Sequence, residues 1–252
     1  MRGLAAAGYV FLLSPLAVVL VLSFSSGQYL TFPPPGISLR WYGELLASGA
    51  VLEAAGRSVV LALLVTAVAV LAGFPAALAV ARGGAPGWME GLLALPLLLP
   101  TLVIGLGLLM VLQPLGLLAT WPGLALGHLM VVLPFVVRLL ATSFRAMPAD
   151  LEAAAATLGA RPVAAFFWVT LPMAAPGAVA AATLSFLLSF DETVISLFLV
   201  GPRLTTLPVT LFRYAETRTD PMLAALAVSL IVLTLAIVLV VDRVVGVTRV
   251  LR

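Results

Sequence analysis

Two short acidic clusters are the most prominent chemical groups in a chain of which only 9% of the residues are charged. The first contains Asp150 and Glu152, and the second is the adjacent pair Asp191-Glu192. An ionised carboxylate in apolar surroundings is costly, so it is normally turned toward water, a cation or a basic partner. Both clusters therefore indicate places where the chain meets a charged ligand or a partner.

The chain lacks the residue combinations that common catalytic sites require. The chain has no cysteine and only one histidine, His128, which excludes thiolate metal sites, cysteine nucleophiles and histidine dyads. A P-loop requires a lysine, and every basic residue here is an arginine. Neither H-E-x-x-H nor G-x-S-x-G occurs. We predict no catalytic residue, metal site or cofactor in this chain, and a structural hydrogen bond for His128.

The apolar content identifies an integral membrane protein. Hydrophobic residues make up 63% of the chain and the mean hydropathy is +1.24, whereas soluble domains are about 45–50% apolar. Six runs of apolar residues match the thickness of a bilayer core. The formal net charge of +3 arises from few charges and does not indicate a nucleic-acid partner. The predicted spans are Leu4–Phe24, Ser58–Val80, Met89–Leu112, Pro122–Phe144, one within Ala164–Val200, and Met222–Val241.

The arginines predict the orientation of these spans. An even number of spans places both termini on the same side. With the N terminus inside, eight of the 13 arginines lie inside and five outside, as the positive-inside rule favours. Arg2, Arg249 and Arg252 are among the eight. We therefore expect a single transmembrane domain over residues 1–252 with both termini in the cytoplasm.

The first acidic cluster lies in a polar interruption, residues 145–172, between spans four and five. Asp150 and Glu152 suit a helix N-terminus electrostatically, Gly159 can provide a left-handed exit, and Pro162 can open a second helix. An amphipathic helix held at a membrane surface is suited to docking in the groove of a partner. Its predicted apolar face contains Leu151, Ala154, Ala155 and Leu158.

The same interruption carries a spaced motif. Glu152-Ala153-Ala154 is followed by Gly159, seven positions after Glu152, and then by Val169-Thr170-Leu171-Pro172. This pattern resembles the EAA signature of binding-protein-dependent ABC importer permeases, with Val169 in place of the isoleucine of that signature. The resemblance implies an all-α polytopic membrane protein with the type I ABC importer permease fold. It also implies six transmembrane helices and a cytoplasmic coupling helix between spans four and five.

In that family the coupling helix enters a cleft on a separate ATP-hydrolysing subunit. Nucleotide-driven closure of that subunit moves the membrane helices between inward-open and outward-open states. ATP and Mg would then be bound by the partner. The resemblance also implies a second homologous permease, two cytoplasmic ATPase subunits, an extracytoplasmic solute-binding protein, and a bacterial-type cytoplasmic (inner) membrane. The implied coupling residues are Asp150, Leu151, Glu152, Ala153, Ala154, Leu158, Gly159 and Ala160.

Further segments resemble the smaller permease of spermidine/putrescine importers. They are Phe32-Pro33-Pro34 with Arg40-Trp41-Tyr42, Leu188–Ser196, Gly201-Pro202 and Thr205–Pro208. The resemblance implies a polyamine substrate, although importers of other solutes share parts of the pattern. A different class, an ion-coupled secondary transporter with Asp191 or Glu192 binding the ion, stays open as an alternative.

The second acidic cluster has two possible placements. If span five begins after Pro172, Asp191 and Glu192 fall in the outer part of the membrane, where one of them faces the bundle interior. If the span begins near Ala164 and ends at Phe190, both are solvated surface charges. We predict Asp191 in the path of a polyammonium substrate, and a structural or arginine-paired role for Glu192.

Overall fold

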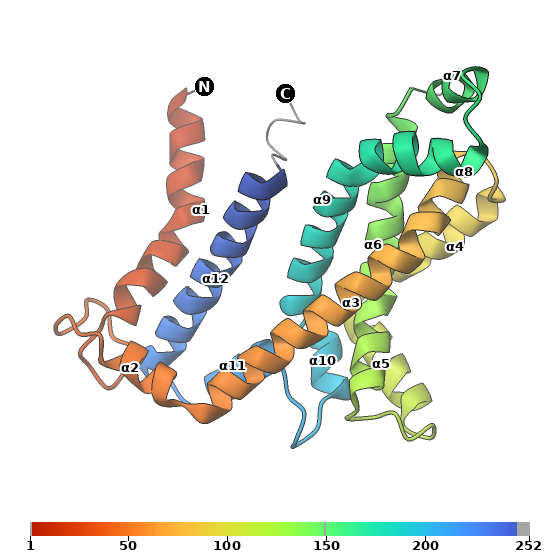
Figure 1. Ribbon diagram of the computed structural model, residues 1–252. Coiled ribbons are helices and arrows are strands. Elements are labelled where there is room, and N and C mark those ends of the chain that lie inside the picture. The colour runs from red at the N-terminus through yellow and green to blue at the C-terminus, as the bar shows by residue number, and fades with distance from the viewer. Residues whose placement is uncertain (1, 149, 246–252) are drawn as a thin grey trace. The chain divides into compact units, whose positions relative to one another are not determined.

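The computed structural model describes residues 2–148 and 150–245 (Figure 1), and most of them are helical. Extended pairing in this part of the chain is limited to two isolated bridges, Ser25–Ile37 and Gly201–Leu204. Arg249 and Arg252, used in the orientation prediction, lie outside the described residues, as does Ala149. The helices are α1 (Arg2–Ser23), α2 (Arg40–Ala47), α3 (Gly49–Ala81), α4 (Gly87–Leu98), α5 (Thr101–Leu112), α6 (Trp121–Arg145), α7 (Leu151–Thr157), α8 (Pro162–Ala165), the π-helix η1 (Phe166–Thr170), α9 (Leu171–Phe190), α10 (Val194–Leu199), α11 (Leu207–Thr217) and α12 (Pro221–Val245).

Four helices in the described part of the chain are long and apolar enough to cross a membrane. They are Gly49–Ala81, Trp121–Arg145, Pro162–Phe190 and Pro221–Val240. The bent pair α4 and α5 makes a fifth if it is counted as one span, and Ala7–Ser23 is a shorter apolar helix. The all-helical class is confirmed, while the number of six spans stays a prediction.

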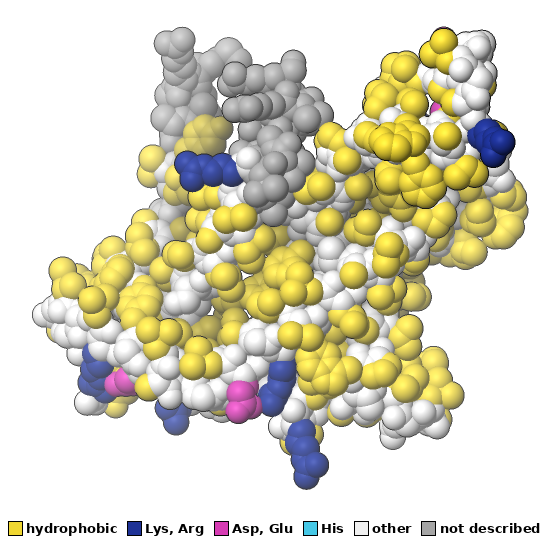
Figure 2. Space-filling view, viewed as in Figure 1, with side chains coloured by type: hydrophobic (Ala, Val, Ile, Leu, Met, Phe, Trp, Pro, Cys, Tyr) yellow, Lys and Arg dark blue, Asp and Glu magenta, His cyan; other side chains and the backbone are white. Residues whose placement is uncertain are grey.

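Apolar side chains dominate the surface in Figure 2, where arginine and acidic side chains occur at only a few points. Large side chains stay exposed along apolar helices: Leu71 of α3 is 75% exposed and Met110 of α5 is 70% exposed. Lipid solvates such side chains, so this surface agrees with the membrane environment that composition predicts.

The third predicted span, Met89–Leu112, is not one continuous helix. The chain breaks at Leu99-Pro100 into α4 and α5, whose axes differ by 99°. Proline has no backbone N–H to donate and disfavours helical backbone in the residue before it. Leu99 accordingly has an extended conformation, with φ −90° and ψ 141°, and Pro100 becomes the N-cap of α5.

The chain divides into two compact units. The first contains the described residues up to Arg57 together with Thr206–Ile237. Within it, the Tyr42 hydroxyl donates to Ser23 Oγ at 2.7 Å, which ties α2 to the end of α1. The Leu30 amide donates to the Thr219 carbonyl at 3.0 Å and so holds the loop after α1 against the segment before α12.

The second unit contains Ser58–Thr205 and the described residues from Val238 onward, and α6 is its central helix. Helices α4, α5, α9 and α10 all pack on α6. The face of α9 that is buried is lined by the small residues Ala174, Ala181 and Ser185, which allow a close approach. At Gly177 a Cβ atom would clash with Ser143 of α6, so α9 and α6 pack closely there.

Glycines in α5 and α6 also allow the short helix α10 to pack closely. A Cβ at Gly127 of α6 would meet Leu199 and Ile195, and a Cβ at Gly105 of α5 would meet the ring of Phe198. The close helix contact that the Gly123-x-x-x-Gly127 spacing allows is therefore present at Gly127. Helix α10 therefore packs closely on both α5 and α6.

This packing makes Gly105→Ala destabilising. We expect overpacking against Phe198 to lower the free energy of unfolding by about 1–3 kcal/mol, despite the better helix propensity of alanine. Gly107→Ala is the matched control, because a Cβ at Gly107 of the same helix meets nothing within 4 Å. Thermal unfolding in detergent measures both variants, and equal melting temperatures would contradict the proposed close packing of α5 and α10.

Candidate functional site

The interruption between α6 and α9 forms the corner that its sequence predicts. Helix α6 ends at Arg145, α7 is a two-turn helix, and Gly159 follows it with a left-handed φ of +86°. Arg161 is then the N-cap of α8, and Pro162 occupies its first turn. Figure 1 places α7 beyond one end of α6 and next to α8, and α7 also contacts η1.

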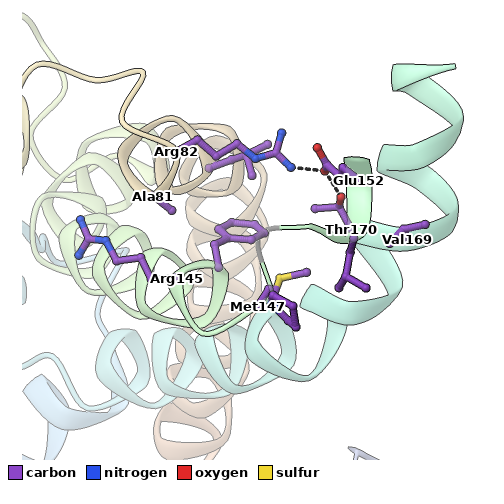
Figure 3. A pocket seen from close by; sticks show the side chains of 11 residues that line it. Ala81, Arg82, Arg145, Met147, Glu152, Val169 and Thr170 are labelled. Carbon is purple, nitrogen blue, oxygen red and sulfur yellow. Dashed lines mark hydrogen bonds and ion pairs between the residues drawn. The ribbon is translucent and has the colours of Figure 1, made fainter. Parts of the chain in front are cut away.

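Glu152 connects α7 by hydrogen bonds to two segments that are distant in sequence. Its carboxylate accepts hydrogen bonds from the guanidinium of Arg82, which directly follows α3, and from the hydroxyl of Thr170, the last residue of η1. Figure 3 shows Glu152 between these two partners. Glu152 therefore links α7 to the end of α3 and to η1, which continues into α9.

These two partners also set the charge of Glu152. The hydrogen bond from Thr170 and, after it, the hydrogen bond and positive charge of Arg82 lower the pKa of the Glu152 carboxyl, against an opposing contribution from partial burial. The carboxylate is thus ionised at neutral pH. Because the Arg82 and Glu152 side chains are 48% and 36% exposed, we attribute less than about 1 kcal/mol of stability to the ion pair. Its main effect is to position α7.

A pocket of about 480 Å³ lies beside this junction (Figure 3). Arg145 points away from Glu152 in this view and pairs with Glu90 of α4 at 3.1 Å. The two arginines at the pocket thus have separate acidic partners. The lining residues are Leu78, Ala81, Arg82, Phe144, Arg145, Met147, Pro148, Leu151, Glu152, Val169 and Thr170.

The predicted coupling residues differ in exposure. Leu151 and Glu152 line the pocket, and Ala160 is half-buried. The side chain of Leu158 is 89% exposed, and none of the α7 residues is buried. Asp150 is the N-cap residue, without a side-chain capping bond. The exposed members of the predicted set are Asp150, Ala153, Ala154, Leu158 and Gly159.

The second acidic cluster occupies a helix break. Helix α9 ends at Phe190, and α10 begins at Val194. Glu192 Oε1 accepts the Ile195 N–H at 3.0 Å and caps α10. Asp191 is exposed, and its carboxylate has no hydrogen bond or ion pair with any residue in the described ranges. The two acids therefore differ: Glu192 caps a helix, whereas the Asp191 carboxylate has no partner among the described residues.

His128 shows where this break lies along α6. Its Nδ1 is 2.8 Å from Ser189 Oγ on α9, and its Nε2 is 2.9 Å from Ser196 Oγ on α10. These contacts confirm the structural hydrogen bond predicted for His128. Since His128 is seven residues into α6, which starts at Trp121, the break lies about 10 Å along that helix at 1.5 Å per residue. The acids follow a helix that begins at Pro162, yet they lie beside α6 rather than beyond its end.

Sequence reasoning did not identify four residues at these sites: Arg82, Thr170, Ser189 and Ser196. Arg82 and Glu152 are 70 positions apart, and single-sequence patterns carry no signal for such a pair. Within the described residues, no three His, Cys, Asp or Glu side chains lie close enough together to hold a metal ion.

The lowered pKa of Glu152 predicts an acid-sensitive attachment of α7. For a carboxyl with a folded pKa below its unfolded value of 4.5, the stabilisation is complete above that value and is lost as pH falls through the folded value. We expect hydrogen exchange of the α7 amides, corrected for intrinsic rates, to increase as pH is lowered to about 3. Glu152→Gln is the control because it does not titrate, and the same acid response in this variant would assign the effect to other groups.

The chain is similar in sequence to known transport proteins along most of its length. Residues 69–248 match the family described as binding-protein-dependent transport system inner membrane component. The chain is 33% identical to the putrescine transport system permease protein PotI of Escherichia coli over 229 residues, 87% of this chain and 81% of that protein. It is 30% identical to the spermidine/putrescine transport system permease protein PotC of Escherichia coli over 240 residues, 94% and 90% of the two chains.

A solved structure agrees in fold. It is the crystal structure of a bacterial ABC transporter involved in the import of the acidic polysaccharide alginate, with a TM-score of 0.65 and 17% identity. The likeness covers 97% of this chain and 93% of that chain. The family match spans well over half of the chain and both relatives align along most of it, so the protein belongs to the inner membrane permeases of binding-protein-dependent ABC importers.

Proposed function

We propose that α7 is the coupling helix through which this permease is driven by a separate ATPase subunit. The observation that carries the proposal is that α7 is attached to the helix ends beside it and also leaves an apolar side chain exposed. Glu152 joins α7 to Arg82 and Thr170, while the side chain of Leu158, directly after α7, is exposed. An exposed amphipathic helix that is attached to the ends of membrane helices is suited to docking in a groove and to passing on displacement.

The attachment supports a route for that displacement. Movement of α7 acts on the end of α3 through Arg82 and on η1 through Thr170. The π-helix η1 leads directly into α9, which packs on α6. Single π-turns inside helices are frequent at functional sites. Closure of the ATPase would therefore shift α3 and α9 together and change the access of the path.

The assembly follows from the same proposal. ATP and Mg bind to two cytoplasmic ATPase subunits, and this chain contributes no residue to their chemistry. A second, homologous permease completes the path, and an extracytoplasmic solute-binding protein delivers the solute. The chain acts as one permease domain over residues 1–252, with six spans and both termini in the cytoplasm, and with the coupling region at about 145–172.

We further propose a polyamine as the solute. PotI and PotC, both similar along most of this chain, carry putrescine and spermidine/putrescine in their names. The free carboxylate of Asp191 at the α9–α10 break suits a cation that carries several ammonium groups. In this proposal Asp191 contacts the substrate, and Glu192 has a structural role as the cap of α10.

Glu152→Arg tests the coupling role. The new side chain faces Arg82, so like-charge repulsion replaces attraction, and we expect ATP-dependent uptake to fall about ten-fold or more. Uptake of radiolabelled putrescine and spermidine is measured in vesicles that carry the complete complex, with ATP hydrolysis followed in parallel. Glu216→Arg is the control, because this exposed acid of α11 forms no ion pair among the described residues.

Gly159 provides a second test of the same prediction. Its φ of +86° disfavours a side chain, although a Cβ there meets nothing within 4 Å. Gly159→Val should therefore impair coupling by backbone strain, whereas Gly159→Asn, a residue that tolerates this conformation, should impair it less. Uptake by this chain alone, driven by an ion gradient and unaffected by Glu152→Arg, would overturn the proposal in favour of a secondary transporter.

Asp191→Asn tests the substrate path. Removing the free charge should raise the KM of polyamine uptake about ten-fold or more while the complex still assembles and hydrolyses ATP. Glu192→Gln is the matched neighbour, since its amide oxygen can still accept the Ile195 N–H, and we expect a smaller change in KM. ATP-dependent activity without uptake of either polyamine would retain the permease and reject the polyamine.

A further inference from the structure

Both sides of the α9–α10 break are attached to one imidazole. Ser189 lies two residues before Asp191, and Ser196 lies two residues after Val194, the start of α10. Their hydroxyls contact opposite nitrogens of His128 at 2.8 and 2.9 Å, an arrangement called here the His128 bridge. All three side chains are at most 3% exposed. The bridge thus spans the acidic turn from inside the protein.

The two carboxylates at this turn belong to different helices. The Asp191 N–H donates to the Leu187 carbonyl, so Asp191 completes the last turn of α9. Glu192 accepts the Ile195 N–H, so its carboxylate moves with α10. The separation and relative orientation of the two carboxylates are therefore set by how α9 and α10 are held at the break.

Helix α10 is already fixed to its neighbours by close packing. It lies against Gly105 and Gly127, where any added Cβ would clash. The end of α9 is held at the same level of α6 by Ser189, through the bridge. Since His128 contacts both helices, it is the common reference point for the two acids.

A neutral imidazole can satisfy both hydrogen bonds of the His128 bridge. A neutral imidazole has one donor and one acceptor nitrogen, and a serine hydroxyl can complement either. Removing one hydroxyl leaves a buried ring nitrogen without a partner, a cost that the break can relieve by shifting. A loss at either serine should therefore change the geometry of the acidic turn.

We propose that His128 is a positioning residue that sets where the Asp191 carboxylate lies relative to α10, and through it the selection among polyamines that differ in length and charge. The inference rests on the proposed function, because it needs Asp191 in the substrate path. It assigns to the only histidine of the chain a role in substrate selection in addition to its role in packing.

The test uses Ser189→Ala and Ser196→Ala in the complete reconstituted transporter, with uptake kinetics for putrescine and spermidine. Each variant removes one contact of the bridge and little volume. Ser185→Ala is the matched control: Ser185 is also buried on α9, but its hydroxyl bonds to the Ala181 carbonyl of its own helix at 2.7 Å. We expect both bridge variants to raise KM about five-fold and to change the ratio of the two KM values. The maximal rate should stay close to that of Ser185→Ala, and any lower melting temperature of the bridge variants reflects the buried ring nitrogen left without a partner.

A second arm distinguishes positioning from a structural role. If the bridge acts through Asp191, Ser196→Ala has no further effect on KM in an Asp191→Asn background. Multiplied effects in the double variant would overturn the inference, as would bridge variants that lower the melting temperature and leave KM unchanged. These outcomes leave the proposed function intact. If Asp191→Asn itself leaves KM unchanged, or if neither polyamine is taken up, the proposed substrate path fails and the inference fails with it.

Discussion

Apolar surroundings offer the backbone no hydrogen-bond partners outside the protein, and the organisation of this permease depends on that constraint. Where a helix is regular, the constraint is met within the helix itself. Where a helix is interrupted, other parts of the chain must provide the partners. The second unit contains three such interruptions, at Leu99-Pro100, in η1 and between α9 and α10, and they lie in elements that pack on α6 or on one another. The packing around α6 is therefore what makes these irregular segments tolerable.

Two of the three interruptions carry the residues of the candidate sites. The π-helix η1 places Thr170 against Glu152 at the corner between α6 and α9, and the α9–α10 break presents Asp191 and Glu192. An irregular turn frees carbonyls and re-aims side chains, so it is where a polar group can enter an otherwise apolar bundle. One continuous helical segment, α8 through α9, joins the two sites. A displacement at the corner and a change at the acidic turn are thus connected by the same element.

The forces at the two sites differ in kind. Glu152, Arg82 and Thr170 form a partly exposed junction that contributes little to stability. Its main effect is to position α7. The His128 bridge is buried, and its cost of disruption is correspondingly higher because no water replaces a lost partner. A loose junction at a docking surface and a firm one beside the path agree with the proposed roles, since the first must yield to a partner and the second must hold a geometry.

Local chemistry by itself determined much of this protein: the apolar runs predicted the membrane class and most of the helices, and the spaced motif from Glu152 to Pro172 predicted the corner and the family. Gly159 and Pro162 were readable because left-handed backbone and a helix first turn favour those residues. The pairing of Arg82 with Glu152 and the two serines on His128 were decided only by the tertiary structure. These features depend on contacts between residues up to 70 positions apart, and the energy of such a contact resides in the packed arrangement rather than in either segment.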